Sequence, residues 1–392
     1  MPSDQAKAAA ARIFTMLLGA AALTAALASA ATASPVHRGA QVGLGKVLTS
    51  KDGSEIFGFD IDQTGDDGLL ATAGSVEIFD QNTGKVTKSL GHLVNQNSDY
   101  VAYGIAAGDV GLIDHEVVPE GQLFPKRHYM VLNPVSGEKI TGKWTPPLHI
   151  IMQQMSKDQA SSITSLFALT SLKQGENPVI LVADIAANTF SNVIHLDPNT
   201  FSLSTIPQFG QYTAGNAAYI AYSPDGGAVG GLAPVNTLID LSTGNVTSLR
   251  GYNNGPFHAG YVTGAAVDPN NGIAATATEL NAQVEFYNMK KLTALSFAQL
   301  PCTGNTDQTY SGSGIAVDPV NKLFLVTETS NACSGGSDSA VIVYDEAGNL
   351  VESIPGFKLF IGEPAPAINP SKHMGWIFGG PNGWSQLQQF FY

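Results

Sequence analysis

The chain has 392 residues, of which 44% are hydrophobic and only 13% are charged, and it contains 42 glycines and 21 prolines. This composition excludes an intrinsically disordered chain and is typical of a sheet-rich protein with many tight turns. The formal net charge at pH 7 is −13. Such a charge excludes nucleic acid and anionic membrane surfaces as expected partners, because both bind through a cationic protein face.

The first 33 residues have the pattern of a secretory signal peptide. Lys7 and Arg12 form a basic start, and an apolar stretch rich in Ala and Leu follows at 13–28. Small residues precede Ser34, where we expect cleavage, and a second possible cleavage site follows Ala30. A transmembrane anchor is the alternative, but the strongly apolar part is short for a span of about 20 residues.

No later stretch is long and apolar enough to cross a bilayer. We therefore expect residues 34–392 to form a single domain with no membrane span, located outside the cytoplasm as a secreted or periplasmic protein. The sequence also leads us to expect a monomer.

A repeated unit organises the rest of the chain. In the stretch 261–288, a short apolar strand ends in Asp268-Pro269, a turn and a second strand follow, and a third strand ends at Asn288. The same order returns over 314–345. Earlier in the chain it is expected over 56–90, and again from Ala217–Ser223, a predicted first strand, to Asp240. Short strands with turn signals at fixed places predict an all-β repeat protein. The predicted third strands end at Asp80, Asn133, Asp197, Asp240, Asn288 and Asp345, with expected insertions at 116–126, 146–160 and 332–339.

A seventh unit is incomplete at the C-terminus. Strands are expected at 365–370, 375–378 and 386–392, and the chain then ends before a fourth strand. The segment Gly45–Ser50 resembles Gly84–Ser89, which is a predicted fourth strand. We therefore predict a seven-bladed β-propeller of four-stranded blades, closed by pairing the N-terminal strand with the C-terminal blade. A six-bladed ring is the alternative, and it would leave one terminus unused.

The two cysteines fit this arrangement. Cys302 lies between the fourth strand of one unit and the first of the next, and Cys333 lies between the second and third strands of that next unit. Since strands alternate in direction, both connections belong to one face, and a disulfide is expected in an exported protein. A metal pair or a reactive thiol is the alternative, but neither cysteine lies in a CxxC motif.

The recurring turns resemble those of the YVTN/NHL-type, lactonase-like superfamily of seven-bladed propellers. The resemblance rests on Ala266–Pro269, Ala316–Pro319, Ala367–Pro370 and Tyr222–Gly226, and the repeat covers most of the chain after the signal segment. No Trp-Asp strand ends indicate a WD40 protein. These residues belong to turns, and no catalytic motif of the superfamily can be transferred residue by residue.

Ligands of propellers usually bind at the mouth of the central channel, where the connections from fourth to first strands and from second to third strands gather. Candidate residues on that face are Glu55, His149, His258, Tyr261, Glu279, Tyr310, Glu328 and Glu363. His258 is the candidate general base, because histidine titrates near neutral pH. Glu55, Tyr261 and Tyr310 are candidate ligand-binding residues.

Glu279, Glu328 and Glu363 are candidate ligands for Ca²⁺ or another hard cation. Solvated loop acids would explain the same three carboxylates, and a histidine bonded to backbone would explain His258. The segment Asp60–Gly68 also has the carboxylate spacing of a calcium loop, but Ala71 stands where such a loop needs a bidentate glutamate. We interpret it as a polar turn on the opposite face, with weak ion binding as the alternative.

Two functional hypotheses follow. The first is a propeller that binds a small molecule, a glycan or a protein through its loop face. The second, implied by the resemblance to lactonases, is a metal-dependent lactonase- or hydrolase-like enzyme in which a cation at the channel mouth polarises a carbonyl.

Overall fold

The computed structural model describes residues 42–392 except 52, 73–74, 92–99, 107–109, 118–125, 133–151, 158–162, 170–177, 185–186, 188, 197–208, 215, 223–234, 251–261, 279–282, 301–313, 329–338, 358–364 and 381–382. The predicted signal segment lies outside these residues, and of strands β6–β9 only the backbone is described. In the described part of the chain, no helix is long and apolar enough to cross a membrane.

The described residues form seven antiparallel sheets, six with four strands and one with three. Four of these sheets are β2(Ile56–Ile61), β3(Asp67–Thr72), β4(Val76–Asp80), β5(Lys85–Ser89); β6(Tyr100–Ala106), β7(Val110–Val117), β8(Lys126–Leu132); β9(Met152–Lys157), β10(Ile163–Leu169), β11(Val179–Asp184), β12(Thr189–His195); and β13(Phe209–Ala214), β14(Ala217–Tyr222), β15(Val235–Asp240), β16(Val246–Arg250).

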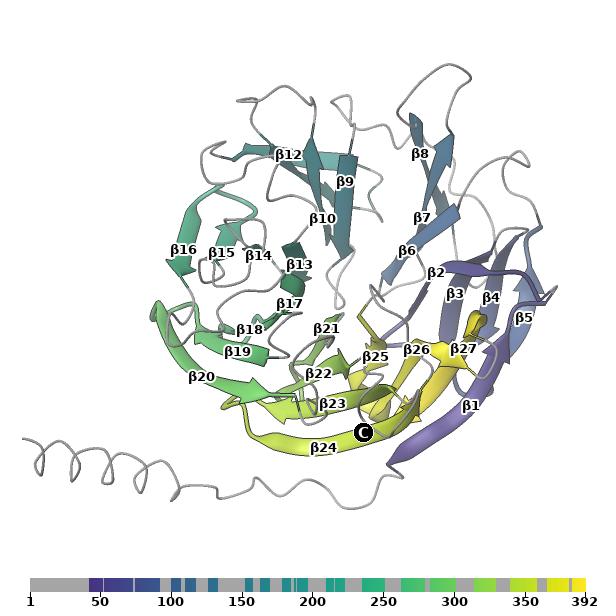
Figure 1. The fold of residues 1–392 in the computed structure, drawn as a ribbon. Coiled ribbons are helices and arrows are strands. Elements are labelled where there is room, and N and C mark those ends of the chain that lie inside the picture. Colours follow the sequence, from purple (N-terminus) through teal and green to yellow (C-terminus); the bar gives the residue numbers. More distant parts are fainter. Residues whose placement is uncertain are drawn as a thin grey trace, which may run out of the picture. The chain divides into compact units, whose positions relative to one another are not determined.

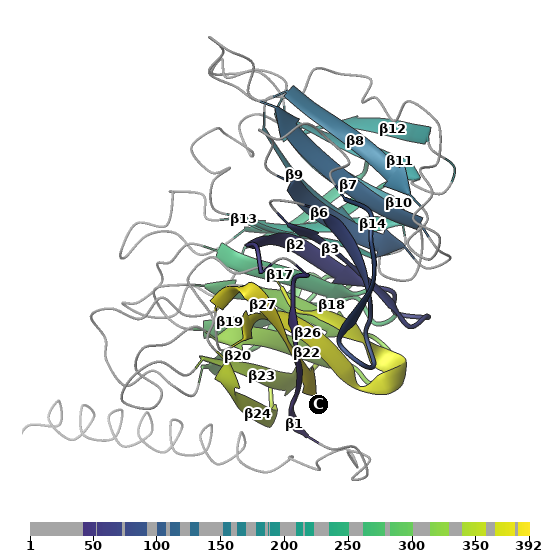
Figure 2. The same ribbon diagram turned by 90° about the vertical axis from the view of Figure 1, so that its right-hand side faces the viewer.

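The other three sheets are β17(Val262–Asp268), β18(Ile273–Thr278), β19(Gln283–Asn288), β20(Thr293–Gln299); β21(Ile315–Asp318), β22(Leu323–Glu328), β23(Ser339–Asp345), β24(Leu350–Phe357); and β25(Ala367–Asn369), β26(Met374–Gly380), β27(Gly383–Phe391) with β1(Gly43–Thr49). A one-turn 3₁₀ helix, Pro370–Lys372, joins β25 to β26. Within each sheet, consecutive strands pair with their neighbours in chain order, and Figure 2 shows the strands edge to edge from the side.

One sheet combines strands from distant parts of the chain. β1 pairs with β27, with Gly43 opposite Phe391 and Thr49 opposite Gln386. Figure 1 shows β1 in purple alongside β27 in yellow. The sequence predicts this pairing from the likeness of the segment around Lys46 to β5.

The described cores lie between neighbouring sheets, because the sheets whose side chains are described have apolar residues on both faces. Phe79 of β4 packs edge-on against Trp376 of β26, with ring centroids 5.6 Å apart. Phe286 of β19 meets Phe324 of β22 in the same way at 5.7 Å. Trp376, Phe79, Phe286 and Phe324 are all fully buried. Sheet-on-sheet packing through such aromatic pairs stabilises a repeat in which no single sheet has a core of its own.

The first strands of neighbouring sheets contact one another. The contacts join β2 to β6, β6 to β9, β9 to β13, β13 to β17, β17 to β21, β21 to β25, and β25 to β2. At the β17–β21 contact, a Cβ atom on Gly264 would lie only 2.9 Å from the Cα of Gly314. The close approach of these two strands therefore requires glycine at position 264.

The predicted strands of the first, fifth, sixth and seventh units are confirmed in order and position. Two middle units were predicted wrongly. Val193–Asp197 was expected to be a third strand, but 193–195 belong to β12, the fourth strand of its sheet. Ala217–Ser223 was expected to be a first strand, but Ala217–Tyr222 is β14, the second strand.

Both errors arise because the sequences of the first strands β9 and β13 lack the pattern expected of a first strand. β9 has the sequence MQQMSK and lies inside the expected insertion 146–160. β13 has the sequence FGQYTA, which contains Phe, Tyr and Thr, but the Pro-containing turn signal typical of a first strand follows β14 instead, as Ser223-Pro224. The true third strand before β15 is β11, which ends at Asp184. The third-strand ends are more evenly spaced along the chain with Asp184 in place of Asp197.

Candidate functional site

The two ends of the sheets carry connections of different length. First and second strands, and third and fourth strands, are joined by short turns such as 269–272, 319–322 and 346–349. Long connections, such as 251–261 and 300–314, join fourth strands to the first strand of the next sheet. Since adjacent strands are antiparallel, these two kinds of connection lie at opposite ends, here called the short-turn end and the long-connection end.

The structure describes two of the residues predicted for the site, Glu55 and Glu328. The others lie outside the described residues: His149, His258, Tyr261, Glu279, Cys302, Tyr310, Cys333 and Glu363. The disulfide, the general base and most of the cation ligands therefore remain predictions.

Glu55 and Glu328 both lie at the long-connection end but in different surroundings. Glu55 is exposed, directly before β2. Glu328 is the last residue of β22, opposite Ala340 of β23, and its exposed fraction is 0%. Glu328 is therefore a buried carboxylate and not a solvated loop acid. Among the described residues, no three His, Cys, Asp or Glu side chains form a group that could hold a metal ion.

The backbone next to Glu328 is held firmly. Thr327 accepts a hydrogen bond from the Gly314 amide at 2.9 Å through its hydroxyl oxygen. The Thr327 amide in turn donates to the Gly314 carbonyl at 3.0 Å. Burial raises the pKa of Tyr344 well above its usual range, and the nearby negative charge of Glu328 raises it further. The surroundings of Glu328 are therefore both rigid and poor in water.

A second set of buried polar groups joins two sheets, and we call it the Tyr219 cluster. The Tyr219 hydroxyl donates to Asn236 Oδ1 at 2.6 Å and lies 2.9 Å from Thr276 Oγ1. Tyr287 donates to the carboxylate of Glu285 in the same interface. All five side chains are buried. The cluster therefore fixes one sheet against the next and is closed to a ligand.

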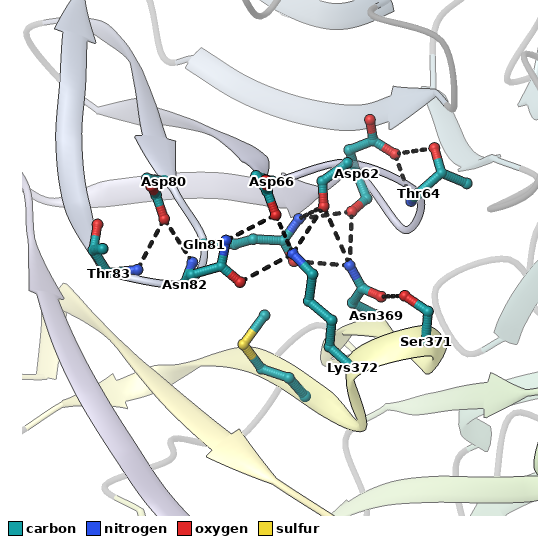
Figure 3. Close-up of polar contacts among 12 residues, drawn as sticks. Asp62, Thr64, Asp66, Asp80, Gln81, Asn82, Thr83, Asn369, Ser371 and Lys372 are labelled. Carbon is teal, nitrogen blue, oxygen red and sulfur yellow. Dashed lines mark hydrogen bonds and ion pairs between the residues drawn. The ribbon is translucent and has the colours of Figure 1, made fainter.

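The predicted calcium-like segment forms a different structure at the short-turn end. Asp62 Oδ1 accepts hydrogen bonds from the amide and the hydroxyl of Thr64, at 2.7 and 2.8 Å. Gln81 Nε2 donates to the carbonyls of Asp62 and Gly65, at 2.8 and 2.7 Å. Figure 3 shows these donors pointing at the loop. The loop carbonyls thus bind protein donors where a calcium loop would bind the ion, which supports the interpretation as a polar turn.

Donors from the last sheet bind the same loop carbonyls and connect the first and last sheets. Asn369 Nδ2, at the end of β25, donates to Asp62 O at 3.3 Å and to Gln81 Oε1 at 3.2 Å. Lys372 Nζ donates to Gly65 O at 3.1 Å and pairs with the carboxylate of Asp66 (Figure 3). The Lys372 ammonium holds the pKa of Asp66 below its usual range. We call Gln81, Asn369 and Lys372 the Gln81 latch.

Two further pairs occupy the equivalent position between other sheets. Tyr392 follows β27 and donates through its hydroxyl to Asp318 at the end of β21, at 3.0 Å. Glu346 follows β23 and lies against the buried Asp268 at the end of β17, with Asn271 donating to Glu346 Oε1 at 2.7 Å. In each case the residue after a third strand bonds the end of the first strand in the preceding sheet. Sequence reasoning missed these latches, because the two partners lie far apart in the chain.

The sheets and their contacts define an all-β protein with a propeller-like fold. Many solved structures are similar to it, among them U3-55K, which is a WD40 propeller. That similarity has a TM-score of 0.57 and covers 88% of this chain and 98% of U3-55K, with 10% sequence identity. At this identity the likeness shows the fold alone. No protein-family model matches the chain, and no curated protein matches its sequence.

Proposed function

We propose that the chain is an exported seven-bladed β-propeller that binds a small molecule, a glycan or a protein through its long-connection end. The contacts between first strands return from β25 to β2, which supports a closed ring of seven blades. The pairing of β1 with β27 supplies the fourth strand of the last blade. The turn residues around Asp268, Asp318 and Asn369 support a place in the YVTN/NHL-type superfamily, and the basic and apolar N-terminal segment supports export.

We choose the long-connection end as the binding face because the two ends of the sheets differ in their connections. At the short-turn end, the side chains of the turns hydrogen-bond one another or the next sheet, as in the Gln81 latch. The long connections at the other end are free to vary without breaking the sheets, and binding residues are concentrated in such loops. The ligand-binding candidates Glu55, Tyr261 and Tyr310 all belong to this end by their place between strands.

Binding to immobilised glycans and proteins tests this proposal. One variant replaces the connection 301–313 with a short Gly-Ser linker, and the matched control carries Asn270→Ser in the short turn 269–272. We expect the linker variant to lose binding to the wild-type ligand while the control retains it. Equal binding by both variants would place the binding face elsewhere, and an array with no ligand for the wild type would argue against a binding protein.

A metal-dependent hydrolase remains the second proposal, and the position of Glu328 at the long-connection end supports it. Its carboxylate would supply an oxygen ligand to a hard cation. Glu279 and Glu363 would complete the oxygen ligands, and His258 would act as the general base. Ca²⁺ should then raise the melting temperature of the wild type and not that of Glu328→Gln. No shift with millimolar Ca²⁺, Mg²⁺ or Zn²⁺, and no turnover of a lactone and ester panel, would exclude this activity.

A further inference from the structure

A groove runs between the outer strands of the first and last sheets. Its volume is about 370 Å³, and it is lined by Thr49 at the end of β1, by Lys51, and by all five residues of β5, Lys85–Ser89. Ligand sites in proteins usually have volumes of roughly 300–1,000 Å³. We call this space the β1–β5 groove. Lys51 belongs to the connection from β1 to β2, and the other lining residues belong to the strands β1 and β5, so the groove follows the outer strands of the sheets.

The lining shows where the groove lies relative to β5. Successive side chains of a strand point to opposite faces of its sheet. Five consecutive residues can line one space only if that space follows the edge of the strand, where the main chain itself is accessible. β5 pairs with β4 along one edge, and in the described part of the chain no strand pairs with its other edge. The groove therefore gives access to unpaired backbone groups of β5.

The charge of the groove is opposite to that of the whole protein. Lys51, Lys85 and Lys88 line it, in a chain with 19 basic and 32 acidic residues. Asp80 lies opposite Lys85 in the β4–β5 pairing and offsets part of this charge, but no acidic residue is among the described residues that line the groove. The groove is thus a local cationic surface on an acidic protein.

Both walls of the groove are held in place. Glu77 of β4 is buried, with 1% exposure, and its carboxylate accepts a hydrogen bond from the Lys51 amide at 3.1 Å. In the middle of β1, Lys46 Nζ donates to the carbonyl of Asn82 at 3.0 Å. The segment from Lys46 to Lys51 is therefore fixed against the first sheet, and the groove exists without a ligand.

We propose that the β1–β5 groove binds an extended acidic peptide, which adds as a strand to the free edge of β5. Main-chain hydrogen bonds along the edge would supply affinity that does not depend on the peptide sequence. Peptide carboxylates facing Lys51, Lys85 and Lys88 would supply the specificity for an acidic partner. Lysines on an edge strand also hinder pairing with neutral or basic strands, including a second copy of β5. The same three side chains therefore protect the edge and select an acidic strand.

The probe is the fluorescein-labelled peptide Thr-Glu-Val-Glu-Val-Glu-Thr, with binding to the full chain measured by fluorescence anisotropy. Two further peptides are its analogue with lysine in place of glutamate and its analogue with alternate amide nitrogens methylated. We expect the acidic peptide to bind and both analogues to bind at least about tenfold more weakly. Equal binding of the methylated peptide would overturn strand addition and leave only attraction between charges. Equal binding of the lysine peptide, or no binding of the acidic one, would overturn the proposal.

Variants of the protein locate the site. The variant Lys51→Gln/Lys85→Gln/Lys88→Gln removes the three lysines that would pair with carboxylates of the peptide. Since such exposed pairs are weak, we expect about tenfold weaker binding of the acidic peptide. Lys290→Gln/Lys291→Gln, in the turn after β19, is the control with exposed lysines elsewhere, and it should bind like the wild type. Both variants should keep the wild-type melting temperature, since these side chains are exposed. Equal loss of affinity in both would show that binding depends on net charge and not on the groove.

Discussion

Aspartate and asparagine at the ends of the strands make two kinds of hydrogen bond, one within their own turn and one to a neighbouring sheet. At the end of third strands, Asp80 and Asp240 accept amide hydrogen bonds from their own turns, and the turn hydroxyl and amides around Asp240 lower its pKa to about 2. At the end of first strands, Asp318 and Asn369 also reach a neighbouring sheet. Local turn chemistry explains the first task. The second requires the packed sheets.

Asn369→Ala tests the Gln81 latch. The substitution leaves the carbonyl of Asp62 with one donor fewer and leaves the buried Gln81 Oε1 without its Asn369 donor. We expect the free energy of unfolding to fall by about 1–3 kcal/mol, as for other buried polar groups that lose a partner. Urea denaturation measures the change. Asn245→Ala, at an exposed turn position, is the control and should lie within about 0.5 kcal/mol of the wild type.

Glu346→Gln tests the pair formed with Asp268. Burial and the Asp268 carboxyl raise the pKa of Glu346 to about 7, while Asn271 and Lys322 act in the opposite direction. The folded chain thus binds this proton more tightly than the unfolded chain, whose ordinary pKa is 4.5. The resulting stabilisation is fully present below the unfolded value and is lost as the pH rises through about 7.

The free energy of unfolding at pH 5 and at pH 8 measures this effect. We expect the wild type to lose on the order of 1 kcal/mol relative to Glu346→Gln between the two pH values, after allowance for the solvent around this half-buried group. Glu352→Gln in β24 is the control and should follow the wild type. A parallel pH profile for wild type and Glu346→Gln would show that the two carboxyls do not share a proton.

At the scale of strands, apolar repeats could be predicted and polar first strands could not. β17, β21 and β25 share small apolar residues that end in Asp or Asn, and their sequences alone locate them. β9 contains no residue that favours a strand strongly, and its place follows from pairing with β10. Its stability comes from the sheet and not from its own sequence. Reasoning from local pattern therefore assigned the wrong strand order to the two neighbouring sheets.

Gly264→Ala tests the close approach of β17 and β21. The new Cβ would lie 2.9 Å from the Cα of Gly314, whose amide and carbonyl are both held by Thr327. We expect a loss of about 1–3 kcal/mol in the free energy of unfolding. Gly91→Ala is the comparison, because its φ of 66° is unfavourable for alanine but no atom lies within 4 Å of the new Cβ. It should cost about 1 kcal/mol, and a larger loss at Gly91 than at Gly264 would contradict the argument.

For the whole molecule, the sequence predicted the architecture better than the site. The repeat and the partnership of β1 with the last strands follow from patterns that recur along the chain. The burial of Glu328 and the latches around Gln81 depend on which side chains face each other across two sheets. A repeat pattern does not show which side chains face each other across two sheets, because each latch uses a different pair of side chains.

Removal of the N-terminal strand tests the role of β1. A variant without residues 1–33 should melt like the full chain, whereas one without residues 1–50 loses the buried Leu48 and exposes the edge of β27. We expect the shorter variant to aggregate or to melt at a much lower temperature. A synthetic peptide covering 42–50 should restore its stability by pairing with β27. Unchanged melting of the shorter variant would show that β1 is dispensable.

The shared sheet of β1 and β25–β27 also sets the order in which the protein can be completed during its synthesis. A chain emerging from the ribosome presents β1 before the other described strands, and its pairing partner, Gly383–Phe391, emerges after them. Folding from the N-terminus can therefore assemble the intervening sheets while β1 remains unpaired. The shared sheet is completed when β1 meets β27, the first and last of the described strands. Exposed strand edges during that interval make newly made chains a natural substrate for chaperones.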